Sequence, residues 1–284
     1  MGDDYFIGEW LGAVCVATLK NMEINKIYCG NCENVLRTFD SESVDMILTS
    51  PPYDNLRAYQ GYEFNFHAIA QALYRVLKKN GVMVWVVSDA TIKGSESTTA
   101  FHQAIYFNEI GLNLHDTMIY QKINPPPVGG HNRYYQSFEY MFVFSKGTPK
   151  TFNPIFTQRT NKHNDKRTKR VKSFTRNRDG IFIKKAVTIN ETVKLKNVWS
   201  YVVGGGNSVE VGLKHPAAFP QQLAEDHIKS WSNKGDIVLD PMCGSGTTLL
   251  AAKKLERHYI GIDICREYCE LSESRLRKKE ESIS

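Results

Sequence analysis

The spacing of apolar residues along the chain predicts alternating strands and helices. Buried strands are expected where short apolar runs lie between turn residues, at 43–50, 81–88, 117–120, 140–144, 237–240 and 259–263. Apolar residues at helical spacing predict helices at 66–79, 98–110 and 217–230, a helix that begins at Thr247, and a terminal helix. This alternation is typical of an α/β fold with a doubly wound, mostly parallel sheet.

The stretch from Lys146 to about Leu213 breaks this pattern. It loses periodicity and gains charge: residues 158–185 contain eleven Lys or Arg and two Asp, a local net charge of +9. The whole chain carries +6, so the remainder carries −3. Basicity that is concentrated in this way favours a polyanion as partner. A separate loop is expected at 124–130, because three consecutive prolines fit neither a helix interior nor a central strand.

The beginning of the chain does not have the character of a signal peptide. Asp3, Asp4 and Glu9 precede its short apolar run, where a signal peptide carries positive charge. We therefore expect residues 1–21 to form an N-terminal extension. No apolar run approaches the ~20 residues of a membrane span. We expect a cytoplasmic protein.

The six cysteines are too few and too scattered for a disulfide framework. Cys29 and Cys32 have the spacing of metal ligands, and Cys265 with Cys269 could complete a set of four. Ordinary reduced thiols near strand ends are the more common explanation for such residues. We predict no metal.

One glycine-containing motif follows a predicted strand and opens a helix. It reads Asp240-Pro-Met-Cys-Gly-Ser-Gly-Thr-Thr248, and Asp263 ends the next predicted strand about twenty residues later. At that spacing a carboxylate can reach the hydroxyls of a ribose. Gly-x-Gly alone indicates only a tight turn, and a phosphate-binding loop is unsupported because no Gly-Lys-Ser/Thr follows.

A second motif, Ser50-Pro51-Pro52-Tyr53, stands where another predicted strand ends. Its two prolines fix the direction of the chain. Without context it could equally be a rigid cap on a loop.

Together the two motifs resemble those of the amino-group DNA methyltransferases, the N4-cytosine/N6-adenine family. The catalytic motif comes first and the cofactor motif last, which is the circularly permuted order of the β group. The resemblance implies a Rossmann-like methyltransferase sheet, S-adenosylmethionine as cofactor, and catalytic roles for Ser50, Pro51, Pro52 and Tyr53. The cofactor-binding residues that it implies are Asn31, Phe219, Asp240, Pro241, Cys243, Gly244, Ser245, Gly246, Thr247 and Asp263. The family usually has Asp where this chain has Asn31.

The catalytic motif suits the chemistry of an exocyclic amine. The lone pair of such an amine is conjugated into the base, so the nitrogen is a poor nucleophile. The Ser50 side chain and the Pro51 carbonyl can accept its two N–H groups and favour a nitrogen that attacks the sulfonium methyl in line. Tyr53 supplies a face on which the extruded base can stack. Methylation of a cytosine ring carbon is excluded, because that branch uses a Pro-Cys nucleophile and none of the ten prolines precedes a cysteine.

The resemblance divides the chain into residues 22–146 as the catalytic half, 147–212 as an inserted target-recognition region, and 213–284 as the cofactor-binding half. In the insert, Phe174, Phe182 and Trp199 could pack or wedge. The Lys and Arg side chains are expected to neutralise phosphates of double-stranded DNA. The predicted DNA-binding residues are Arg159, Lys166, Arg167, Lys169, Arg170, Lys172, Arg176 and Arg178.

Ser50 resembles the N4-cytosine members, whereas Asp is more typical of N6-adenine members at this position. We therefore favour cytosine, with adenine as the alternative. A catalytically inactive DNA-binding relative, or an enzyme for RNA or a small molecule, is disfavoured by the intact motifs, the permuted order and the basic insert. The sequence leaves open two further partners, a second copy of the chain in a homodimer and a cognate restriction endonuclease.

Overall fold

The computed structural model describes residues 22–52, 64–125, 132–158, 170–188, 191–203 and 220–281. Within these ranges no helix combines the length and apolar character that a membrane crossing requires. The helices are α1 (Cys32–Arg37), α2 (Phe66–Val76), α3 (Thr99–Glu109), α4 (Gln221–Trp231), α5 (Thr247–Lys254) and α6 (Arg266–Glu281). The strands of the main sheet are β1 (Lys26–Cys29), β2 (Val44–Thr49), β3 (Leu77–Val87), β6 (Asn113–Lys122), β7 (Phe138–Ser145), β12 (Val198–Tyr201), β13 (Ile237–Asp240) and β14 (His258–Asp263).

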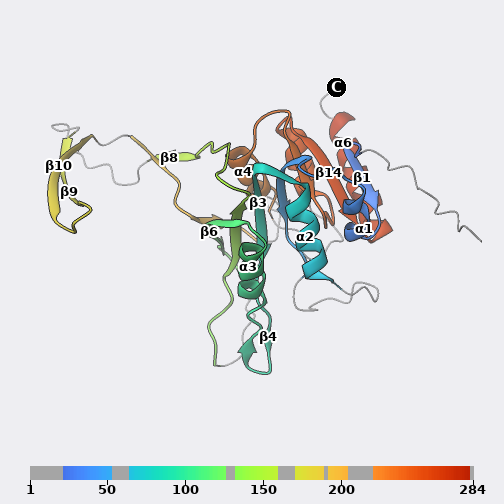
Figure 1. The fold of residues 1–284 in the computed structure, drawn as a ribbon, viewed down its shortest axis with the longest axis horizontal. Coiled ribbons are helices and arrows are strands. Elements are labelled where there is room, and N and C mark those ends of the chain that lie inside the picture. The colour runs from blue at the N-terminus through green and yellow to red at the C-terminus, as the bar shows by residue number, and fades with distance from the viewer. Residues whose placement is uncertain are drawn as a thin grey trace, which may run out of the picture.

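The main sheet has the strand order β1-β14-β13-β2-β3-β7-β6-β12. Its labelled strands β6, β3, β14 and β1 follow one another from left to right in Figure 1. Strand β7 runs antiparallel to both of its neighbours, and every other neighbouring pair is parallel. The prediction of an α/β fold with a mostly parallel sheet is thereby confirmed. Three smaller antiparallel ribbons stand outside this sheet in the described ranges: β4 (Thr91–Ile92) with β5 (Ser95–Glu96), β8 (Phe156–Gln158) with β11 (Thr192–Lys194), and β9 (Arg170–Arg176) with β10 (Phe182–Thr188).

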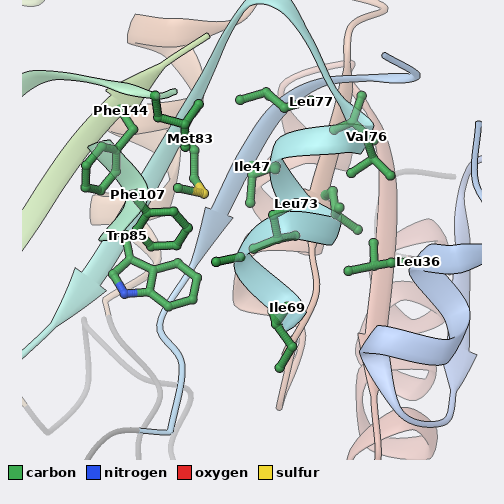
Figure 2. Packing of buried hydrophobic residues seen from close by; sticks show 14 of the residues in the cluster. Leu36, Ile47, Ile69, Leu73, Val76, Leu77, Met83, Trp85, Phe107 and Phe144 are labelled. Carbon is green, nitrogen blue, oxygen red and sulfur yellow. The ribbon is translucent and has the colours of Figure 1, made fainter. Parts of the chain in front are cut away.

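Alternate residues of the central strands pack into two hydrophobic cores, one on each face of the sheet. On one face, Ile47 of β2 and Met83 and Trp85 of β3 belong to one hydrophobic cluster with residues of α1, α2 and α3 (Figure 2). On the other face, Met46 and Leu48 of β2 contact α4 and α5. Helix α6 packs beside β1, β14 and α5. Because helices cover both faces of the sheet, the ends of its strands are the places where a site can form.

The predicted helix at 66–79 is wrong in its last turn. Helix α2 ends at Val76, and Leu77 opens strand β3 by pairing with Val44. Asn80 and Gly81, which suggested the end of a helix, lie within this strand. Asn80 adopts φ +64°, and a Cβ on Gly81 would lie 2.8 Å from the carbonyl oxygen of Asp45. The Asn-Gly pair therefore allows a close approach between strands and does not cap a helix.

One strand of the main sheet lies within the predicted insert 147–212. Strand β12 pairs in parallel with β6, and Trp199 on it is buried, with its ring centroid 4.7 Å from that of His227. Trp199 therefore packs in the core and cannot act as a wedge. Most of the predicted loop 124–130 lies outside the described residues.

Candidate active site

The two sequence motifs meet at one edge of the sheet. Strands β2 and β13 are parallel neighbours, paired through Val238↔Met46 and Leu239↔Ile47, so their carboxyl ends point the same way. Ser50 follows β2 directly and is half-buried. In open α/β sheets, ligands bind outside the carboxyl ends of the strands. The fold thus places the predicted catalytic turn beside the predicted cofactor loop.

The cofactor loop has a backbone that only glycine adopts easily. Gly244 and Gly246 have φ of +50° and +78°. A Cβ on Gly246 would lie 2.7 Å from Oγ of Ser272, and the same hydroxyl donates a hydrogen bond to the Gly244 carbonyl at 2.7 Å. Arg275 donates to the carbonyl of Ser245. Helix α6 therefore holds the loop against the sheet, a function of Ser272 and Arg275 that the sequence pattern did not indicate.

The side chains of the loop are buried. Cys243, Ser245 and Thr247 are 6%, 2% and 7% exposed, and Pro241 is buried as well. Burial raises the pKa of the Cys243 thiol well above its ordinary value, so it stays protonated. Contacts from this loop to a ligand would come mainly from its backbone, as a tight glycine turn allows.

Asp263 ends β14 and fastens the cofactor loop. Its Oδ2 accepts the backbone N–H of Gly244 at 2.8 Å and its Oδ1 that of Cys265 at 2.9 Å. Burial raises the pKa of this carboxyl, although these backbone hydrogen bonds oppose the shift. Each carboxylate oxygen keeps a further lone pair, which suits the hydroxyl of a ribose.

Asn31 lies one strand away, after β1, which pairs with β14 through Cys29↔Asp263. Its Oδ1 accepts the N–H of Asn34 at 3.2 Å and caps α1, which leaves its NH₂ to donate. An amide donor beside a carboxylate acceptor fits an adenosine, whose ring nitrogens accept and whose ribose donates. The residues present therefore fit S-adenosylmethionine.

Asp240 ends β13 and is 2% exposed. Its Oδ1 accepts the Thr49 hydroxyl at 2.7 Å and the N–H of Met242 at 3.2 Å. Burial raises the pKa of Asp240 to about 6, while hydrogen bonds from Thr248, Thr49 and Met242 oppose that rise. Thr49 directly precedes the catalytic motif and Thr248 ends the cofactor motif, but sequence reasoning gave neither residue a role.

Several predicted site residues cannot be placed. Tyr53, Phe219, Arg159, Lys166, Arg167 and Lys169 lie outside the described residues. Arg170 and Lys172 belong to strand β9, of which the backbone is described. Arg176 and Arg178 are exposed, and the Arg176 guanidinium lies 4.9 Å from the ring centroid of Phe182 across the β9–β10 ribbon.

The four cysteines considered as metal ligands lie near the same edge. Cys269 is buried, and its Sγ donates to the carbonyl of Asp263 at 3.4 Å. Burial raises the pKa of Cys32 to about 11. In the described part of the chain, no three His, Cys, Asp or Glu side chains are grouped so as to hold a metal ion.

Known proteins resemble this chain over more than four-fifths of its length. It is 50% identical over 241 residues to the orphan methyltransferase M.BamHII of Bacillus amyloliquefaciens, a match that covers 83% of this chain and 89% of that protein. It is 29% identical over 273 residues to the type II methyltransferase M.HpaI of Haemophilus parainfluenzae, covering 88% and 74%.

Solved structures share the fold. The M1.HpyAVI–SAM complex superposes with a TM-score of 0.55 at 25% identity and covers 88% of this chain and 98% of that one. PvuII DNA methyltransferase (cytosine-N4-specific) superposes with a TM-score of 0.63 at 21% identity, covering 87% and 84%. Residues 44–274 match the model of the family N6_N4_Mtase, described as DNA methylase. The chain belongs to this family and is a DNA methyltransferase that uses S-adenosylmethionine.

Proposed function

We propose that the enzyme methylates the exocyclic N4 amine of a cytosine that has been flipped out of duplex DNA. The observation that carries this is Ser50, which follows β2 directly at the edge where β13 delivers the cofactor loop. A hydroxyl at the first position of the motif resembles the N4-cytosine members of the family. The buried Pro51 behind it supports a fixed direction for the turn.

In this mechanism the chain positions the amine and accepts its hydrogens. Bound S-adenosylmethionine supplies a methyl group on an electrophilic sulfonium centre. The Ser50 hydroxyl oxygen and the Pro51 carbonyl oxygen accept the two N–H groups, which makes the nitrogen more pyramidal and frees its lone pair. Tyr53 stacks on the extruded base. Asn31 and Asp263 would hold the adenosine, and the backbone of Gly244–Gly246 would contact the methionine part.

The test is to identify the modified nucleoside. The protein is incubated with labelled S-adenosylmethionine and mixed-sequence duplex DNA, and the DNA is digested and separated by chromatography with mass detection. We expect N4-methylcytosine. Label on N6-methyladenine alone would replace this proposal with adenine methylation, and no label in any nucleoside would favour the inactive DNA-binding relative.

Two variants test the catalytic roles. Ser50→Ala and Tyr53→Ala are each expected to lose methyl transfer while they bind the cofactor as the parent protein does. Turnover at the parent rate in either variant would contradict the role assigned to that residue.

We further propose that the basic segment between β8 and β10 binds the DNA backbone. Replacement of Arg167, Lys169 and Arg170 by Gln should weaken DNA binding and reduce the slope of log K against log salt by about 2 to 3, because each phosphate that a cation neutralises adds about 0.9 to that slope. A matched control removes three exposed cations elsewhere, Lys26, Lys234 and Arg277. Equal losses in the two triple variants would show a general charge effect and refute a local site.

The assignment of 147–212 as the target-recognition region and the cytoplasmic location remain predictions. A homodimer and a cognate restriction endonuclease are partners that the sequence leaves open. The name of the relative M.BamHII includes the word orphan. This favours an enzyme that acts without an endonuclease partner.

A further inference from the structure

The two halves of the active site are joined by buried polar groups. Backbone pairing of β13 with β2 covers Val238↔Met46 and Leu239↔Ile47. Beyond these pairs, at the end of the strands where the site lies, the Thr49 hydroxyl donates a 2.7 Å hydrogen bond to Oδ1 of Asp240. Thr49 is fully buried and immediately precedes Ser50.

The Asp240 carboxylate contacts three elements. Besides Thr49, it accepts the N–H of Met242 in the cofactor loop at 3.2 Å, and it is hydrogen-bonded by Thr248 in the first turn of α5. The Thr248 hydroxyl also lies 3.4 Å from the carbonyl oxygen of Leu48 in β2. Asp240 and Thr248 therefore connect the cofactor loop and α5 to the end of β2 by hydrogen bonds.

We propose that Thr49 and Asp240 are positioning residues, which set the distance and angle between Ser50 and the cofactor loop and so align the amine with the methyl group. This inference rests on the proposed function. Methyl transfer needs an in-line approach, and a misplacement of about 1 Å can cost about 100-fold in rate. The bond is buried, so water does not compete for it, and its loss leaves the carboxylate short of a donor.

The test separates alignment from cofactor binding and from folding. Thr49→Val keeps the shape of the side chain and removes the donor. With cofactor saturating, its single-turnover rate of methyl transfer is expected to fall about ten-fold or more, while its Kd for S-adenosylmethionine changes less than about three-fold, roughly 0.65 kcal/mol. Thr49→Ser keeps the hydroxyl and should restore the rate to within about two-fold.

A matched control is Thr151→Val. Thr151 is 6% exposed, and its hydroxyl accepts a hydrogen bond from Asn233 at 2.9 Å beside the opposite end of β13. This variant loses a buried hydroxyl and is expected to lose some thermal stability. Its single-turnover rate of methyl transfer should match that of the parent protein. An unchanged rate in Thr49→Val, or an equal loss in Thr151→Val, would overturn the proposal.

A second variant covers the case in which Thr49→Val does not fold. Asp240→Asn keeps the size and one acceptor oxygen, and it should lower the single-turnover rate more than it weakens cofactor binding. A loss confined to cofactor Kd would refute the positioning role. If the parent protein itself transfers no methyl group to DNA, the proposed function fails. If the parent transfers and the variants match it, only the positioning inference fails.

Discussion

His227 should make the protein lose stability in mild acid. This residue of α4 is fully buried, with Nε2 3.1 Å from the sulfur of Met141 and its ring beside that of Trp199. Its Nδ1 has no hydrogen-bond partner among the described residues. Burial lowers the pKa of His227 from 6.5 to about 3, because the charged imidazolium would be left without water or a counter-ion.

The sign and size of the effect follow from proton linkage. Between pH 6.5 and pH 3 the unfolded chain binds a proton at this histidine and the folded chain does not, so acid favours unfolding. The loss of folding free energy begins as the pH falls through 6.5, the pKa of this histidine in the unfolded chain. It grows by about 1.4 kcal/mol per pH unit below that value. At pH 5 the loss of folding free energy amounts to about 2 kcal/mol.

The assay is urea denaturation at pH 7, 6 and 5 of the parent protein and of His227→Leu. Carboxylates titrate in both proteins and cancel in the comparison. From pH 7 to pH 5 the parent should lose about 2 kcal/mol more than the variant. His102→Leu, the same change at an exposed position of α3, should retain the parental pH dependence. The reasoning is refuted if His227→Leu loses as much stability as the parent, or if the imidazole of His227 titrates near 6.5 in the folded protein.

Two further predictions concern stability and the cofactor loop. Asp45 is 5% exposed and forms ion pairs with Lys78 at 2.8 Å and with Lys150 at 2.6 Å. Asp45→Ala removes the carboxylate from both ion pairs. In urea denaturation it should lower the free energy of unfolding by about 3 kcal/mol. A decrease below about 1 kcal/mol would show that these ion pairs contribute little. Gly246→Ala should lower the free energy of unfolding more than Gly235→Ala does. Both glycines have φ near +79°, but only at Gly246 would the added Cβ meet a neighbouring atom. Of the two variants, only Gly246→Ala should weaken cofactor binding in equilibrium dialysis. Equal effects in the two variants would exclude the steric cause.

The local elements were largely predictable from the sequence, because apolar period and turn residues are local signals. Strand β13 has the predicted bounds, β14 begins one residue earlier than predicted, and α3 is one residue shorter than predicted at each end. The exceptions arose where distant chain segments decide. Leu77 continues the helical spacing of α2, yet pairing with Val44 draws it into β3. No local sequence pattern indicates whether Leu77 continues the helix or joins the strand.

Strand β12 shows the same limit more strongly. Its four residues stand in a charged segment without periodicity, and its partner β6 lies about 80 residues earlier in the chain. Only the tertiary fold makes Trp199 a core residue. The same holds for Ser272 and Arg275, which support the cofactor loop from α6 with no sequence motif to mark them.

The permuted order of the motifs has little physical consequence for the site. What the chemistry requires is that the carboxyl ends of β2, β13, β14 and β1 lie side by side, and the strand order supplies that whichever segment comes first. In this order, however, Ser50 and the cofactor loop have no short connection along the chain. Thr49 and Asp240, which join them by a hydrogen bond, are 191 residues apart in the sequence. Apolar packing is non-directional and tolerates small shifts, whereas a buried hydrogen bond has a narrow range of distance and angle. A site that is assembled from two distant segments therefore depends most on directional bonds where the segments meet. The buried hydrogen bond between Thr49 and Asp240 lies at that place.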